Sequence, residues 1–111
     1  MATEYIELIC VGEVSASTEV AHEYTPVNNA SVILETFEGD GAYIAGSVIK
    51  VVWDYGVTND IVWTIKGDAS KPDMYRPTYT GDGTKKIALA CQNGEGTAIY
   101  LSGYVRLRIE T

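Results

Sequence analysis

Apolar and polar side chains alternate with a period of two through most of the chain, and this alternation limits its possible folds more than any other feature. The clearest run is YVRLRIE at residues 104–110, with apolar residues at one parity and charged residues at the other. Shorter runs with the same period lie at residues 5–10, 32–35, 48–55, 61–66 and 87–91. Successive side chains of a strand point to opposite faces, so the pattern predicts strands that are buried on one face only.

Turn-forming residues separate these runs, as in EGDG at 38–41, GDG at 81–83 and NGEG at 93–96. A length of 111 residues is typical of one domain. We therefore predict an all-β fold with a single domain over residues 1–111, a jelly-roll-like antiparallel β-sandwich of about eight short strands. Gly103, inside the last alternating run, predicts a bulge or bend there.

Strand parity also predicts which aromatic residues lie in the core. Trp53 shares its parity with apolar residues 49 and 51, and Trp63 shares its parity with Ile61 and Ile65, so both tryptophans are expected to be buried. In jelly-roll sandwiches the first and last strands are often neighbours. We therefore expect Glu7 to lie across from Arg106 and Arg108, closing one sheet with cross-strand charge pairs.

Two connections are expected to be long loops, at about 12–31 and 69–84, with a short helix over 17–23 as a weaker alternative for part of the first. Long loops on a sandwich often carry binding residues. Tyrosine and arginine are enriched at interface hot spots. The candidate partner-binding residues are therefore Tyr75, Arg76 and Tyr79 in the second loop, with Glu19 and Glu23 in the first. The sequence leaves open whether the tyrosine-containing loop contacts protein or sugar.

Charge is unevenly distributed along the chain. Residues 1–49 hold eight acids and no Lys or Arg, residues 50–111 hold seven acids and eight bases, and the sum of −8 and +1 gives the net charge of −7. Such a chain is a poor ligand for a nucleic-acid backbone. The asymmetry predicts either charge pairing between the two halves or an acidic patch that faces a basic partner. The acidic first strand is also expected to be able to add to a partner's sheet as an edge strand.

The sequence offers little support for catalysis, a cofactor or a metal site. The one histidine, His22, stands in a polar stretch with no Ser–His–Asp arrangement around it, and we expect no enzyme activity. The acids in the turns at 38–40 and 81–83 could ligate calcium, but one acid per turn supplies too few oxygens. A turn-forming role is therefore predicted for them.

Cys10 and Cys91 both lie in apolar stretches, and Glu4 and Glu7 stand where a secretory signal would carry Lys or Arg. We expect no export by that route and buried, reduced thiols. A single disulfide stays open as an alternative if the first strand lies beside the strand that carries Cys91. No apolar run approaches the roughly 20 residues of a transmembrane helix.

The segments VIKVVWDYG at 48–56, DIVWTIKG at 60–67 and GYVRLRIE at 103–110, in a chain of this size, resemble the small capsid-decorating "staple" protein of epsilon-fifteen-like short-tailed bacteriophages. The resemblance covers the whole chain in size, β content and layout. It implies a jelly-roll protein made in the host cytoplasm and placed on the outer capsid surface of the virion. There it would clamp neighbouring major capsid subunits as a homodimer or small symmetric homo-oligomer, without catalytic residues.

A second class of function fits the same architecture. A non-catalytic carbohydrate-binding module that recognises a surface polysaccharide would use the same jelly roll and the same tyrosine-containing loop.

Overall fold

The computed structural model describes residues 2–40, 46–65, 69–71 and 77–111. In these ranges the chain forms nine strands and no helix. The strands are β1 (Thr3–Val14), β2 (Glu19–Tyr24), β3 (Ser31–Asp40), β4 (Val48–Trp53), β5 (Asp60–Ile65), β6 (Ala69–Lys71), β7 (Thr78–Thr80), β8 (Ile87–Gln92) and β9 (Ile99–Glu110).

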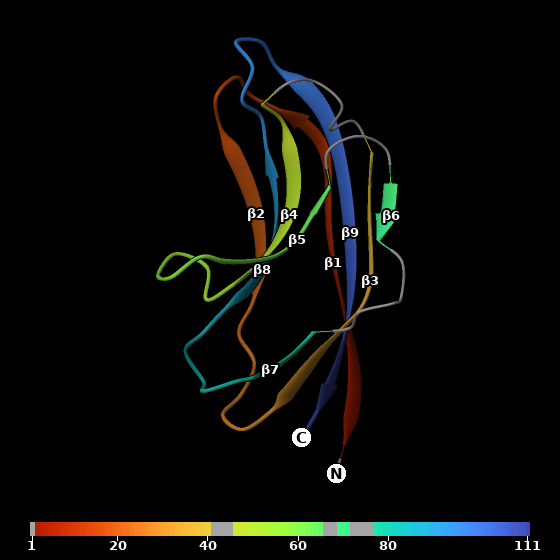
Figure 1. The fold of residues 1–111 in the computed structure, drawn as a ribbon, viewed down its shortest axis with the longest axis vertical. Coiled ribbons are helices and arrows are strands. Elements are labelled where there is room, and N and C mark those ends of the chain that lie inside the picture. The colour runs from red at the N-terminus through yellow and green to blue at the C-terminus, as the bar shows by residue number, and fades with distance from the viewer. Residues whose placement is uncertain (1, 41–45, 66–68, 72–76) are drawn as a thin grey trace.

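The strands form two antiparallel sheets that face each other (Figure 1). One sheet has the order β1-β9-β3-β6, with the short β7 also paired to β3, and the other has the order β2-β8-β4-β5. The chain passes from one sheet to the other at most connections, and this order of strands is that of a jelly roll. The predicted all-β jelly-roll sandwich is confirmed, with nine described strands where about eight were expected.

The first and last strands are neighbours, as predicted. Strands β1 and β9 pair in one unbroken antiparallel register that runs from Thr3 opposite Glu110 to Val14 opposite Ile99. The ladder continues past both strands, because Ala2 and Thr111 exchange two backbone hydrogen bonds of 3.1 and 3.0 Å. Both chain ends therefore lie at one end of the molecule (Figure 1).

The charged side chains of β9 make the contacts that hold this face of the sheet. Arg106 stands opposite Glu7 in the register, and its guanidinium lies over the Tyr5 ring, 4.3 Å from the centroid. Arg108 forms ion pairs with Glu35 on β3 (3.4 Å) and with Glu110 (3.1 Å). Residues from three adjacent strands thus meet through β9.

We expect the double charge reversal Arg106→Glu and Arg108→Glu to lower the melting temperature by roughly 5–10 °C, corresponding to about 1–2 kcal/mol. The change removes the cation–π contact and places like charges beside Glu7 and Glu35. Thermal unfolding followed by circular dichroism measures it, with the neutral pair Arg106→Gln and Arg108→Gln as the milder control. An unchanged melting curve for the reversal would contradict the assignment.

The core between the sheets contains both tryptophans, which confirms the parity prediction. Trp53 is 7% exposed and Trp63 is 4% exposed. Trp63 stacks on Phe37 of β3, with ring centroids 5.7 Å apart and an interplanar angle of 9°. This contact joins the two sheets through a fully buried aromatic pair.

Parity fails at Ile61, which was expected to face inward with Trp63 but is 56% exposed. The register between β4 and β5 shifts at this point, so that Val51 pairs with Trp63 but Val52 pairs with Ile61. The extra residue, Val62, packs against the core instead. A β-bulge therefore turns Ile61 to the outer face, because one inserted residue reverses the parity beyond it.

The two predicted long loops contain strands. The stretch 12–31 holds β2, and no helix forms there. Its polar composition reflects its place at the edge of a sheet, where Val20 and His22 remain exposed beside β8. The stretch 69–84 holds β6 and β7, which both pair with β3.

Gly103 does not cause the bulge that was one of the two predictions for it. It pairs in regular register with Cys10 on one side and Gly39 on the other. A Cβ atom built on Gly103 would lie 2.8 Å from Ile49 Cγ2, and one built on Gly39 would lie 2.8 Å from Ile49 Cδ1. The two glycines therefore leave the space that the Ile49 side chain of the opposite sheet occupies.

Candidate functional site

Three of the five residues predicted to bind a partner are described by the structure, and they lie on two different strands. Tyr75 and Arg76 lie outside the described residues. Glu19 and Glu23 lie on β2, at one edge of their sheet, and Tyr79 lies on β7, which pairs with the other sheet. The structure therefore does not bring the described candidates together into one site.

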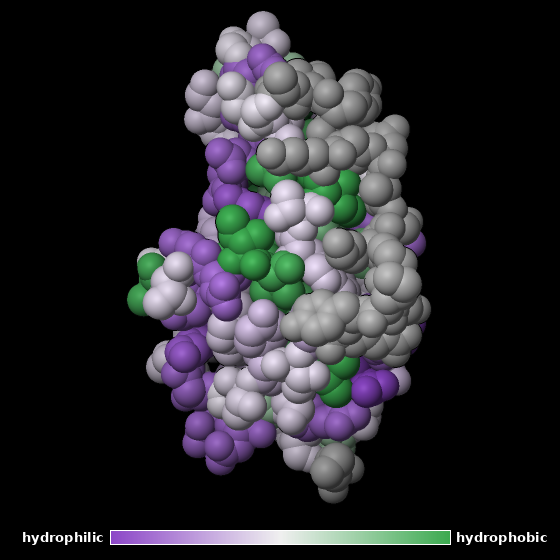
Figure 2. Space-filling model, in the orientation of Figure 1, coloured by the Kyte–Doolittle hydropathy of each residue, from purple (hydrophilic) through white to green (hydrophobic). Residues whose placement is uncertain are grey.

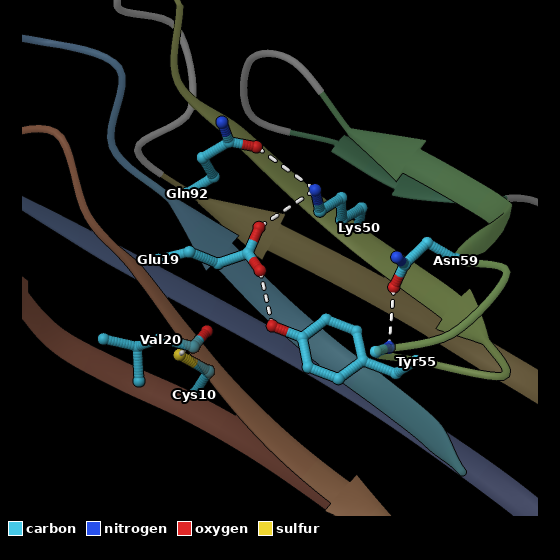
Figure 3. Close-up of polar contacts among 8 residues, drawn as sticks. Cys10, Glu19, Val20, Lys50, Tyr55, Asn59 and Gln92 are labelled. Carbon is cyan, nitrogen blue, oxygen red and sulfur yellow. Dashed lines mark hydrogen bonds and ion pairs between the residues drawn. The ribbon is translucent and has the colours of Figure 1, made fainter. Parts of the chain in front are cut away.

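Glu19 is the centre of a polar network on the outer face of the β2-β8-β4-β5 sheet (Figure 3). Its carboxylate forms an ion pair with Lys50 Nζ at 2.9 Å and accepts a hydrogen bond from the Tyr55 hydroxyl at 2.5 Å. Lys50 Nζ also donates to Gln92 Oε1 at 3.2 Å. The network joins β2, β8, β4 and the turn after β4.

These contacts shift the pKa values of both acids in the network. The hydrogen bond to Glu19, together with burial, raises the pKa of the Tyr55 phenol to about 12. Burial opposes ionisation of Glu19, but the hydrogen bonds from Tyr55 and Lys50 outweigh it, and the pKa of Glu19 is lowered. At neutral pH Glu19 is therefore a carboxylate and Tyr55 a neutral phenol.

We expect an absorbance titration of the tyrosines to show one phenol that ionises near pH 12, and Tyr55→Phe to remove it. Because the folded pKa of Tyr55 is raised above the unfolded value of 10.0, its contribution to stability is complete below pH 10 and is lost between pH 10 and about 12. Chemical unfolding at pH 9 and pH 11 measures this loss. An equal loss in wild type and Tyr55→Phe would contradict the assignment.

Glu23 also has a partner within the chain. Its carboxylate lies 3.2 Å from Lys86 Nζ, and both side chains are more than a third exposed. An exposed pair of this kind contributes about 0–1 kcal/mol. Glu19 and Glu23 thus hold cations of their own chain, and their contact with a partner protein stays a prediction.

Tyr79 does not occupy the exposed loop position that was expected. It stands opposite Val32 on β3, whose side chain is fully buried, so the two side chains share the inner face. The Tyr79 ring stacks on Trp53, with centroids 4.9 Å apart and an interplanar angle of 23°. Tyr79 is partly buried against the core, and its first role is in packing.

A shallow hollow on the outer face of the β1-β9-β3 sheet was not predicted. Tyr5, Glu35, Thr36 and Arg106 line this open hollow, which has a volume of about 250 Å³. The register between β3 and β9 shifts between Leu34 and Thr36, which places Glu35 at an irregularity. The alternating pattern of the sequence predicts that Tyr5 and Arg106 point to the outer face. It does not predict the register shift that brings Glu35 beside them.

Exposed apolar side chains gather along the β1 edge of the same sheet. Ile9 is 53% exposed and Val11 is 59% exposed on β1, and Tyr100 on β9 is 63% exposed. On the face that Figure 2 draws, apolar residues form small separate patches. Large exposed apolar side chains on neighbouring strands are a feature of protein contact surfaces.

The two cysteine thiols are free and buried. Burial, with a further contribution from the neighbouring Cys10, raises the pKa of the Cys91 thiol. Cys10 Sγ lies 3.9 Å from the Val20 carbonyl oxygen (Figure 3), and Cys91 Sγ lies 3.9 Å from the Cys10 carbonyl oxygen. Because a thiolate is the reactive form of cysteine, this environment makes Cys91 a poor nucleophile at neutral pH.

The acids of the two predicted turns behave differently: Glu38 and Asp40 lie in strand β3, so the turn role predicted for them is wrong, whereas Asp82 caps a turn. Asp82 Oδ1 accepts hydrogen bonds from the Thr84 and Lys85 amides and from the Thr84 hydroxyl, and these bonds lower its pKa to about 2. Among the described residues, no group of three or more His, Cys, Asp and Glu side chains is placed to hold a metal ion. The turn role predicted for Asp82 is confirmed.

The described residues form a jelly roll that carries an open hollow and exposed apolar side chains on the outer face of one sheet. No protein-family model matches the chain, and no curated protein matches its sequence. In the described ranges, no helix has the length and apolar character needed to cross a membrane.

Proposed function

We propose that this chain is a structural virion protein, a decoration protein that binds the outer face of a bacteriophage capsid and clamps neighbouring major capsid subunits. The observation that supports this best is the long β1 edge, where Ile9 and Val11 are exposed beside the acids of the same strand. An exposed sheet edge with apolar side chains favours contact with another protein. The hollow nearby is too open to enclose a substrate.

The size and shape of the molecule support a multivalent arrangement. Its principal extents are 46 × 27 × 19 Å, so a single contact with a capsid can cover only a small area. Contact with two capsid subunits, or pairing with a second copy as a homodimer or small symmetric oligomer, would combine weak contacts through effective concentration. The net charge of −7 would favour a basic region of the capsid.

Co-sedimentation with capsids tests this proposal. Heads of a short-tailed phage of the group that the chain resembles, prepared without their decoration protein, are mixed with the purified chain and pelleted. We expect saturable binding with a fixed stoichiometry per capsid subunit, and greater resistance of the decorated heads to heat. Absence of binding to such heads would contradict the proposal.

A carbohydrate-binding module remains the second candidate, and the hollow at Tyr5, Glu35, Thr36 and Arg106 is the observation that favours it. Polar side chains beside an aromatic ring suit a sugar. The Arg106 guanidinium already covers one face of the Tyr5 ring, however, which leaves less of that ring for stacking. Retention on polysaccharide affinity gels that is lost in Tyr5→Ala would support this second candidate over the first.

A further inference from the structure

The free edge of β1 presents a regular row of backbone hydrogen-bonding groups. In the described part of the chain β1 pairs only with β9, which leaves its other edge open. Ala2 and Thr111 form a hydrogen-bonded pair, since each backbone N–H donates to the carbonyl of the other. In an antiparallel ladder, hydrogen-bonded pairs alternate with pairs that form no hydrogen bond to each other. The unbroken register therefore directs the backbone groups of the even residues to β9. The odd residues from Thr3 to Glu13 direct theirs outward.

The β1 edge differs from the other described sheet edges in length and regularity. It has twelve residues in one register, whereas β2 and β5 have six each and β6 has three. The β5 edge is also interrupted by its bulge against β4. Proteins usually protect long edges with prolines, bulges or short strands, and β1 has none of these. Its protective features are its acidic side chains and Gly12, whose φ of +144° departs from the ordinary strand conformation near the end of the row.

The odd-numbered side chains of β1, which lie on the outer face of the sheet, follow a simple order in chemical type. Along residues 7, 9, 11 and 13 the side chains are acidic, apolar, apolar and acidic. Ile9 and Val11 are more than half exposed. Glu13 has no hydrogen bond or ion pair with any described residue, and Glu7 accepts a hydrogen bond from the Tyr104 hydroxyl at 2.7 Å. Both ends of the row therefore attract a cation, and its middle favours an apolar side chain.

We propose that the β1 edge accepts an extended segment of the partner protein as an added strand, and that this segment has the pattern basic-x-apolar-x-apolar-x-basic. Main-chain hydrogen bonds to the odd residues of β1 would supply affinity, and the side-chain order would set the register. The pattern spans seven residues because Glu7 and Glu13 are six positions apart. Because this residue pattern is the same in both chain directions, the segment could pair with β1 in either a parallel or an antiparallel orientation. This inference rests on the proposed function, with the major capsid protein as the source of the segment.

A second copy of the chain is a poorer occupant of this edge. Two-fold pairing would place Glu4, Glu7 and Glu13 of both copies on one two-stranded ribbon. Registers centred on Glu7 or Cys10 would set glutamates directly opposite each other, which is destabilising. Each copy also carries a net charge of −7. Charge complementarity therefore favours a basic strand over self-pairing.

The capsid experiment separates this inference from the proposed function. Ile9→Pro removes an outward N–H and leaves the bonds to β9 in place, whereas Ile9→Thr removes the apolar side chain but keeps the N–H. If wild type binds the heads, we expect Ile9→Pro to bind about tenfold more weakly and Ile9→Thr to lose less. If wild type does not bind them, the proposed function fails. If wild type and a folded Ile9→Pro bind equally, the inference about the edge fails.

Binding of a peptide to the wild-type chain tests the same inference without any substitution in β1. The probe is Thr-Lys-Thr-Val-Thr-Val-Thr-Lys-Thr, and its control has the same composition with the Lys and Val positions exchanged. We expect the probe to slow amide hydrogen exchange at Tyr5, Glu7, Ile9, Val11 and Glu13 while leaving the even residues unchanged, and to bind more weakly as salt is raised. Equal effects of the two peptides, or self-association of the chain through β1, would overturn the proposal.

Discussion

Trp63→Ala is expected to lower the free energy of unfolding by about 3–5 kcal/mol, the usual cost of removing a buried tryptophan. The Trp63 side chain is 4% exposed and stacks on Phe37, which is fully buried on the opposite sheet. Alanine would leave a cavity between the sheets and would expose one face of the Phe37 ring to it. A domain of this size has a total stability of about 5–15 kcal/mol, so the loss is large but measurable.

Urea unfolding at equilibrium measures the effect, with Tyr100→Ala as the matched control. Tyr100 is 63% exposed, and we expect its removal to change stability by about 0.5 kcal/mol or less. A double-mutant cycle with Phe37→Ala should give a coupling of about 0.5–1.5 kcal/mol for the aromatic pair. Near-native stability of Trp63→Ala would contradict the arrangement of the core.

Asn93→Ala is expected to cost about 3 kcal/mol, because one buried amide side chain satisfies several backbone groups. Asn93 is 1% exposed. Its Nδ2 donates to the carbonyls of Val14 (3.0 Å), Ser15 (3.3 Å) and Thr97 (2.8 Å), and its Oδ1 accepts from the Glu95 amide (2.8 Å). These bonds join the end of β1 to the turn before β9, so their loss would loosen one end of the sandwich.

Asn93→Asp separates hydrogen bonding from packing at almost the same volume. At neutral pH its carboxylate would face three carbonyl oxygens, and we expect a larger loss of stability than in Asn93→Ala. The folded pKa of the new acid would be raised, so its stability deficit would shrink as the pH falls toward the unfolded value near 3.9. Unfolding of both variants at pH 7 and pH 4 measures this. A deficit that grows on acidification more than in wild type would contradict the assignment.

Strand parity could predict most of the fold because it records which side of each strand is buried. It placed Trp53 and Trp63 in the core, and the expectation that first and last strands are neighbours was also confirmed. It failed at Ile61, where a bulge adds one residue, and it missed β2, whose exposed edge position gives it a polar sequence. Bulges and edges depend on neighbouring strands, which a local pattern does not include.

The candidate site was less accessible to sequence reasoning. Tyr79 was expected to be exposed because it lies in the predicted loop at 69–84, but pairing with Val32 turns it toward Trp53. The hydrogen bonds of Asn93 and Glu19 join residues that are far apart in the chain, so no local sequence pattern predicts them. The open β1 edge could be foreseen as a strand, but its freedom from any second described neighbour follows only from the strand order.

The pairing of Ala2 with Thr111 has a mechanical consequence. Tension applied between the two chain ends would peel β1 from β9 one rung at a time, so the molecule would yield at low force. Tension applied along β1, as by a strand bound to its open edge, would load the rungs of the β1–β9 ladder together in shear. The molecule would thus resist tension best when it is applied along β1 through a bound strand, and least when it is applied between the two chain ends.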